Sequence, residues 1–185
     1  AIAYTIDRDY IINTLHQGMT TEALGGIHPN SPFYNPNVER YDVDLDKARA
    51  LLAEAGYADG YPDKLVFPVQ ETTRNQQWGA LIQANLKEIG LDLDIQIHSA
   101  SELFEVVASG AYDIGNSGAC PAPLLDPSAY FRPCFGTKAD GTHADNNFAR
   151  WINKDFNDIL TKFQLEPDLT VRIGQAREME TILNG

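Results

Sequence analysis

The chain has 185 residues, and 43% of them are hydrophobic. The formal net charge is -12, because 14 lysine and arginine residues stand against 26 aspartate and glutamate residues. This length is enough for one globular domain with a sizeable core, or at most two small ones. Such an acidic surface repels phosphate backbones, which argues against nucleic-acid binding. No apolar run approaches the roughly 20 residues of a membrane-spanning helix, and two cysteines are too few for a disulfide-built miniprotein.

The first part of the chain predicts helices separated by a long loop. Residues 1–6 read as the last turns of a helix, so we expect the sequence to be a piece of a longer protein. Asp7 is placed to cap a second helix. The proline- and glycine-rich stretch over residues 25–44 predicts an ordered loop. Asp44 then caps a helix with an apolar stripe, which Gly56 ends.

Short strands and helices alternate in the middle of the chain. Residues 64–69 and 91–98 predict strands, the second from regular alternation of apolar and polar residues. Pro68 places the first of these strands at an edge. An amphipathic helix separates the two, a helix capped by Ser101 follows, and residues 111–116 predict a third strand. This β-α-β-α-β order predicts an α/β fold with a mostly parallel sheet.

The last third of the chain predicts irregular structure followed by helices. The irregular stretch extends to about residue 153, and two amphipathic helices follow around residues 156–163 and 169–183. Because no composition shift or repeat divides the sequence, we expect residues 1–185 to form a single domain.

The sequence contains no convincing catalytic or metal-binding constellation. The four histidines are scattered, so a zinc site is not indicated, and no phosphate-binding loop is present. The nearest nucleophile pattern, GNSGA over residues 115–119, lacks the closing glycine and is followed by Pro121. Two cysteines remain: Cys120 and Cys134 are compatible with a disulfide or with two buried thiols, and Cys120 with a distant histidine is the enzyme alternative.

Binding is better supported than catalysis. In open α/β sheets, ligands lie beyond the carboxyl ends of the strands. The segment after the third predicted strand is too long for a simple connection, and it mixes small residues, prolines and aromatics. Aromatic residues of this segment, among them Phe131 and Phe135, are expected to pack the loop onto the domain. For Trp151, a core role and a ligand-contacting role are both open. The candidate ligand-binding residues are Asn116, Ser117, Gly118, Ala119, Cys120 and Trp151.

Several stretches together resemble one known family. In chain order they are AIAYTIDRDYII, YDVDLDKARALLAEAGY, IQANLKEIGLDLDIQI, GAYDIGN, the dipeptide Asp126-Pro127 and NNFARWINKDFNDIL. These stretches are similar to those of the solute-binding proteins of peptide/nickel-type ABC transporters, extracellular solute-binding family 5 of the dipeptide and oligopeptide class. The resemblance covers nearly all 185 residues.

The resemblance implies a two-lobed fold in which residues 1–185 form most of the C-terminal lobe, truncated at both ends. It implies capture of a solute between lobes and delivery to a membrane ABC permease, by a monomer that needs no cofactor and catalyses no reaction. It also implies a periplasmic or cell-surface location. An oxidising compartment favours a disulfide between Cys120 and Cys134.

One departure from the family pattern concerns the ligand. Peptide-binding members usually carry an aspartate three residues before the acidic residue of the dipeptide, where it pairs with the peptide's amino terminus. Counted without gaps, that position is Pro123 here, and the aromatic residue expected three positions earlier is Cys120. Because a buried ammonium without a carboxylate is costly, sugars, opines and metal chelates stay open beside peptides.

Overall fold

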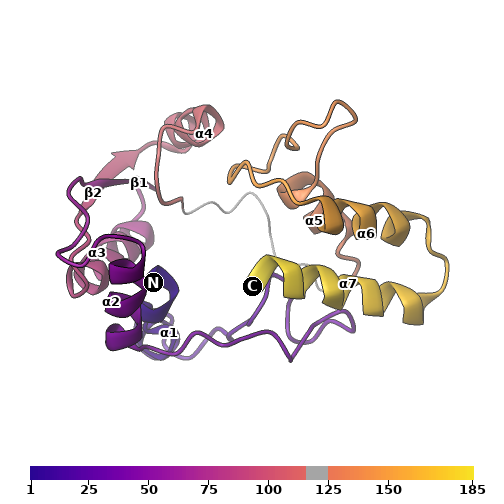
Figure 1. Cartoon of the computed structure of the whole chain (residues 1–185), viewed down its shortest axis with the longest axis horizontal. Coiled ribbons are helices and arrows are strands. Elements are labelled where there is room, and N and C mark those ends of the chain that lie inside the picture. The colour runs from indigo at the N-terminus through magenta and orange to yellow at the C-terminus, as the bar shows by residue number, and fades with distance from the viewer. Residues whose placement is uncertain (116–124) are drawn as a thin grey trace. The chain divides into compact units, whose positions relative to one another are not determined.

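The computed structural model describes residues 1–115 and 125–185, and these form two compact units (Figure 1). The first unit comprises residues 1–20 and 41–116, and the second comprises residues 21–40 and 117–185. The first unit contains a 3₁₀ helix (Ile2–Thr5), α1 (Arg8–Tyr10), a π-helical turn (Ile11–Leu15), α2 (Leu45–Glu54), β1 (Leu65–Gln70), α3 (Thr73–Lys87), β2 (Leu93–His98) and α4 (Ala100–Ser109). The second contains α5 (Ser128–Phe135), α6 (Lys154–Leu165) and α7 (Leu169–Asn184).

A parallel pair of strands is the centre of the first unit. β1 and β2 pair in register from Leu65 with Leu93 to Gln70 with His98. The predicted crossover helix is α3, which packs on one face of the pair, while α4 lies on the other face (Figure 1). Leu93 and Ile95 of the alternating β2 sequence pack in one core cluster with residues of α3, whereas Ile97 is 55% exposed. The α/β class predicted from the periodicity is confirmed.

The predicted third strand does not form within the described residues. Residues 111–115 contain no strand, although the amides of Asp113 and Ile114 both donate to the Val66 carbonyl at 3.0 and 3.1 Å. The Val66 amide donates at 2.7 Å to the carboxylate of Asp113, so a side chain occupies the donor that a third strand would need. Two residues further along β1, Pro68 has no backbone N–H to donate on this side. This side of β1 is therefore an edge of the sheet, as expected.

The helix boundaries agree with the capping signals in most places. Asp44 caps α2 through the Lys47 amide, as predicted, and Thr72 caps α3. The prediction of Ser101 as the cap of α4 is wrong. Ser99 caps that helix, because its side chain and that of Glu102 form a reciprocal capping box. The first helix after Asp7 is also short and passes into a π-helical turn.

Two glycines let the loops at the start of the strands meet. Gly60 and Gly90 both have positive φ, at 93° and 80°, and a Cβ atom on Gly60 would lie 2.6 Å from the Gly90 carbonyl oxygen. The Tyr61 amide donates to that same carbonyl at 3.1 Å. Only glycine tolerates both the backbone angle and the approach, so this contact fixes the position of Tyr61.

Aromatic side chains form the core of the second unit. Phe131, Phe156 and Phe163 are fully buried, and the Phe131 ring contacts those of Phe156 and Phe163 edge to face, with centroids 5.9 and 6.2 Å away. Phe131 belongs to α5, a helix inside the stretch that the sequence predicted as irregular. The prediction fails there because Pro127 precedes the helix and Pro133 lies inside it, and prolines disfavour helix. Burial of its aromatic residues nevertheless stabilises the helix.

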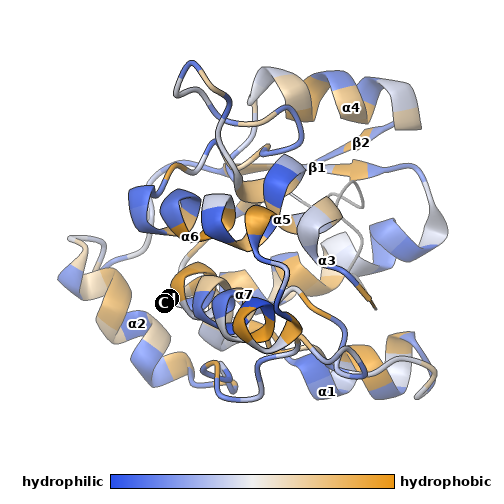
Figure 2. Ribbon diagram, turned by 90° about the vertical axis from the view of Figure 1, so that its right-hand side faces the viewer, coloured by the Kyte–Doolittle hydropathy of each residue, from blue (hydrophilic) through white to orange (hydrophobic). Residues whose placement is uncertain are grey.

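The helices are amphipathic, as the sequence predicted for the last two. In Figure 2, α2 and α6 each carry hydrophobic and hydrophilic residues in alternation along the ribbon. α6 and α7 pack side by side over the aromatic core. Within residues 1–115 and 125–185, no helix combines the length and the apolarity that crossing a membrane requires.

A buried carboxylate joins α7 to the loop over residues 21–40. Glu180 is only 1% exposed, and its two oxygens accept the amides of Ile27 at 2.9 Å and Asn35 at 3.0 Å. Burial raises the pKa of Glu180, although these backbone hydrogen bonds oppose the shift. Gly25 and Gly26 leave room for the carboxylate and for the Tyr130 hydroxyl, respectively, where a Cβ atom would collide.

We expect Glu180→Ala to lower the free energy of unfolding by about 2–3 kcal/mol, because it leaves two buried amides without acceptors. The exposed neighbour variant Glu178→Ala is the matched control and should change stability by less than about 0.5 kcal/mol. Urea denaturation followed by circular dichroism measures both. Equal midpoints for the two variants would contradict the role given to Glu180.

Candidate functional site

The carboxyl ends of β1 and β2 meet at one edge of the sheet. The Glu71 amide donates to the His98 carbonyl at 2.8 Å, which closes the ladder at that edge. Both strands lead directly into helices, so the amino ends of α3 and α4 follow at the same edge. This is the edge at which α/β proteins bind ligands.

Side chains at this edge are largely committed to capping. Ser99 donates to Glu102 at 2.7 Å, and this hydrogen bond, followed by that of the Ser99 amide, lowers the pKa of Glu102. The carboxylate is therefore ionised at neutral pH. His98 Nε2 is buried and has no hydrogen-bond partner within residues 1–115 and 125–185. The edge thus offers one uncommitted imidazole nitrogen beside a negative charge.

Five of the six predicted ligand-binding residues lie outside the described residues. Asn116, Ser117, Gly118, Ala119 and Cys120 all fall within residues 116–124, which we call the candidate segment. The described residues on either side of it show how its two ends are held. Before it, Asp113 and Ile114 bind the backbone of Val66, as described above, so this end is fixed to β1 in the first unit.

An ion pair in the second unit fixes the residues that follow the candidate segment. Asp126 accepts hydrogen bonds from the amide and hydroxyl of Ser128 at 2.8 and 2.6 Å, and from the Arg172 guanidinium at 2.9 Å. Arg172, on α7, also lies over the Phe163 ring, 4.5 Å from its centroid. The aspartate of the predicted dipeptide is therefore attached to both α5 and α7.

The same contacts set the charge of Asp126. Partial burial by itself would raise the pKa, but hydrogen bonds from Ser128 and then from Arg172 outweigh it and lower the pKa of Asp126. The carboxylate is ionised at neutral pH, as an ion pair with Arg172 requires. Its charge is neutralised inside the second unit, which makes it a positioning group for the neighbouring chain.

Trp151, the sixth predicted residue, packs against the aromatic core of the second unit. Its ring lies edge to face with Phe156 at a centroid distance of 5.2 Å, and it is half-buried. Its backbone amide donates to the Asn147 side chain at 3.2 Å, and its carbonyl accepts from the same side chain at 2.7 Å. The core role is therefore present, while the exposed part of the ring keeps the ligand-contacting role as a prediction.

Asn147 is a residue that the sequence argument missed. It is fully buried, and its side-chain amide also donates to the Gly136 carbonyl at 3.3 Å. An asparagine in a polar loop predicts a turn, and no periodicity marks it as buried. Arg150 has a positive φ of 53°, which marks a tight loop just before Trp151. A sequence alone does not reveal a positive φ.

Cys134 is buried in the aromatic core of the second unit and is disulfide-bonded. The described residues include no free cysteine. Cys120 lies in the candidate segment outside the described residues, so the pairing of these two cysteines stays a prediction. A cysteine in a disulfide does not provide a nucleophilic thiolate, and the cysteine of the enzyme alternative, Cys120, lies outside the described residues.

The arrangement favours binding by a positioned chain over chemistry. Within residues 1–115 and 125–185, no three histidine, cysteine, aspartate or glutamate side chains are grouped so as to hold a metal ion. The charged groups near the candidate segment are committed to caps and to the ion pair of Asp126 and Arg172. The described residues that flank the candidate segment are held by backbone contacts with Val66 on one side and by the ion pair of Asp126 with Arg172 on the other.

Comparison with solved structures identifies the class of protein to which this α/β fold belongs. A periplasmic binding protein associated with an ABC transporter, DppA from Helicobacter pylori in complex with the peptide STSA, superposes with a TM-score of 0.87 at 25% identity. The match covers 99% of this chain and 35% of that one. The fold is that of a periplasmic binding protein, as the resemblance implied.

The sequence profile of the bacterial extracellular solute-binding proteins, family 5, matches residues 1–142. The chain belongs to this family. It is 25% identical to the dipeptide-binding protein of Escherichia coli over 100% of its own length and 34% of the relative's. It is 28% identical to heme-binding protein A of Haemophilus influenzae, over 88% of this chain and 29% of that protein. The chain thus spans about one third of the length of these relatives.

We expect Asp126→Asn to lower the free energy of unfolding by about 1 kcal/mol at pH 7, because the half-exposed ion pair with Arg172 loses its charge. The folded-state pKa of Asp126 lies below the unfolded value, so its stabilisation is present above the unfolded pKa and is lost as the pH falls through the folded pKa. The difference from the wild-type protein should therefore disappear in acid.

Thermal unfolding between pH 7 and pH 3 measures this difference. Asp158→Asn, which removes the exposed pair with Lys154 on α6, is the control and should leave the midpoint nearly unchanged. A difference between Asp126→Asn and the wild-type protein that persists unchanged at pH 3 would show that the charge of Asp126 is not its cause.

Proposed function

We propose that these 185 residues form most of the C-terminal lobe of a two-lobed extracytoplasmic receptor, which captures a peptide-type solute between its lobes and delivers it to an ABC permease. The observation that carries the proposal is the match of the whole chain to about one third of the peptide-binding relatives. Both compact units are assigned to this lobe.

The capture mechanism follows from what such a site must do. A solute is bound by backbone groups and a few placed side chains, and closure of the hinge between lobes removes it from water. The candidate segment supplies backbone groups that small residues leave accessible, and Trp151 supplies an aromatic wall. The residues on either side of the segment are held by Val66 in the first unit and by Arg172 in the second.

No bond is made or broken in this mechanism. The relatives are binding proteins, and Cys134 is disulfide-bonded, so the cysteine-nucleophile alternative has no free described thiol to support it. The receptor works as a monomer and presents its closed form to the membrane permease. This assigns it to the periplasm or to the cell surface.

A second candidate function differs from the first in the chemical nature of the solute. Pro123 stands where the resemblance places the carboxylate that binds a peptide's amino terminus. A solute without a free ammonium group, such as an oligosaccharide or a metal chelate, needs no carboxylate there. A peptide-type solute is the main proposal, and a non-peptide solute of the same family is the alternative.

We expect the 185-residue chain to bind its solute far more weakly than the full-length receptor, because the opposing lobe supplies about half of the contacts. A thermal-shift screen of the full-length protein against peptides, oligosaccharides and metal chelates identifies the solute, since a ligand that binds only the folded state raises the melting temperature. Calorimetry then compares the two proteins. Equal affinities would contradict the proposal that the solute lies between lobes.

We expect Pro123→Asp in the full-length receptor to raise affinity for a tripeptide with a free amino terminus by about tenfold, since a charge-assisted hydrogen bond contributes about 1.5 kcal/mol or more. The same tripeptide with an acetylated amino terminus should show no gain, and Pro123→Asn is the matched uncharged control. Calorimetry measures all four combinations. An equal gain for both peptides, or for both variants, would contradict the assignment of position 123 to the amine.

A further inference from the structure

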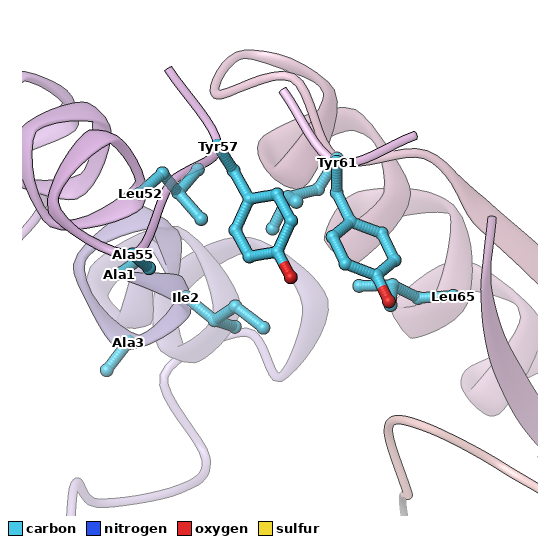
Figure 3. Close-up of a pocket in the computed structure, with 9 residues that line it drawn as sticks. Ala1, Ile2, Ala3, Leu52, Ala55, Tyr57, Tyr61 and Leu65 are labelled. Atoms are coloured by element: carbon cyan, nitrogen blue, oxygen red, sulfur yellow. The ribbon is translucent and has the colours of Figure 1, made fainter. Parts of the chain in front are cut away.

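A polar pocket lies in the second unit, where α5 runs into the loop before α6. Its volume is about 480 Å³, which is inside the roughly 300–1,000 Å³ range of small-molecule sites. Its lining includes the side chains of Arg132, Thr137, Lys138, Asp145 and Asn146. The pocket of the first unit in Figure 3 is similar in size, but aliphatic side chains and two tyrosines line it, without a charged side chain. Of these two pockets, the polar one is therefore suited to a charged ligand.

Hydrogen bonds fix the part of the polar pocket that follows α5. Thr137 and His143 form an antiparallel bridge, and the Lys138 amide donates to the Thr142 carbonyl at 2.7 Å. The amide and the hydroxyl of Thr137 also donate to the side chain of Asn157 on α6, at 3.0 and 3.1 Å. The loop that carries Lys138 is therefore attached to a core helix of this unit. Because the loop is already ordered, binding of a ligand loses less conformational entropy.

Two of the charges in the pocket neutralise each other. Lys138 Nζ lies 2.5 Å from a carboxylate oxygen of Asp145. The hydrogen bond to Asp145 and the attraction between the two charges raise the pKa of Lys138. Lys138 is therefore protonated at neutral pH, and the pair adds no net charge to the pocket.

Arg132 adds a positive charge that this ion pair does not balance. Its side chain is exposed and has neither a hydrogen-bond partner nor an ion-pair partner within residues 1–115 and 125–185. Arg172 of α7 differs, because it is committed to Asp126. A guanidinium is ionised at neutral pH, and its planar N–H groups match the geometry of a carboxylate. On a chain with a net charge of -12, an unbalanced cation in a preformed pocket indicates an anionic ligand.

We propose that this pocket binds a small molecule through a single carboxylate group, which Arg132 holds. The carboxylate accepts a bidentate pair of hydrogen bonds from the guanidinium. The ion pair of Lys138 with Asp145 lies beside it, and the exposed carboxylate of Asp145 disfavours a second negative charge on the ligand. The volume leaves room for a molecule larger than the bare anion. This site is independent of which solute the full-length receptor captures between its lobes.

Calorimetry of the full-length receptor with N-acetylalanine, a monocarboxylate that also carries an amide, tests the proposal. We expect N-acetylalanine to bind and N-acetylalaninamide, which lacks the carboxylate, not to bind. Arg132→Gln should weaken the binding of N-acetylalanine about tenfold, whereas Lys162→Gln, which removes an exposed cation of α6, should leave the affinity nearly unchanged. Failure of N-acetylalanine to bind, equal binding of the two compounds or equal effects of the two variants would overturn the proposal.

Removal of the acid of the ion pair provides an independent measurement with the opposite sign. Asp145→Asn leaves Lys138 without its hydrogen-bonded partner, so we expect N-acetylalanine to bind several-fold more tightly. Asp158→Asn is the matched control, because it releases Lys154 from an exposed pair that is also 2.5 Å long and does not line the pocket. An unchanged affinity in Asp145→Asn, or an equal gain in both variants, would contradict binding of the carboxylate in this pocket.

Discussion

The parallel pairing of β1 with β2 is the constraint on which the first unit depends. Parallel strands require a crossover, and α3 provides it while its apolar face covers one side of the sheet. The same pairing brings Gln70 and His98 to one edge and the loops of Gly60 and Gly90 to the other. Strand direction alone therefore places the carboxyl ends of the strands and the loops that precede them at opposite edges.

Two different interactions hold the sequences that flank the candidate segment. Backbone hydrogen bonds to Val66 hold one side, and the ion pair of Asp126 with Arg172 holds the other. These interactions differ in their response to solvent: the backbone contact is insensitive to pH, whereas the ion pair weakens when its carboxylate is protonated.

The sequence predicted those features that depend on periodicity and capping. Alternation identified β2, and Asp44 identified the start of α2, because each signal is local. One failure is local, since Ser99 and not Ser101 caps α4, and the other failures involve distant partners. The carboxylate of Asp113 replaces a third strand, burial stabilises α5 in spite of Pro133, and the buried Asn147 holds Trp151 through contacts that no pattern records. The family was recognisable from the order of its stretches, but the ligand-binding residues rest on their place after the third predicted strand and lie mostly outside the described residues.

The function proposed for the full-length protein is that of a receptor that closes on a solute and leaves it unchanged. Small-angle X-ray scattering of the full-length protein, with and without the solute found by screening, tests this most directly. The account predicts that the radius of gyration decreases on binding and that the solute recovered afterwards has its original mass. A bound solute with no change in the radius of gyration, or recovery of a converted product, would contradict it.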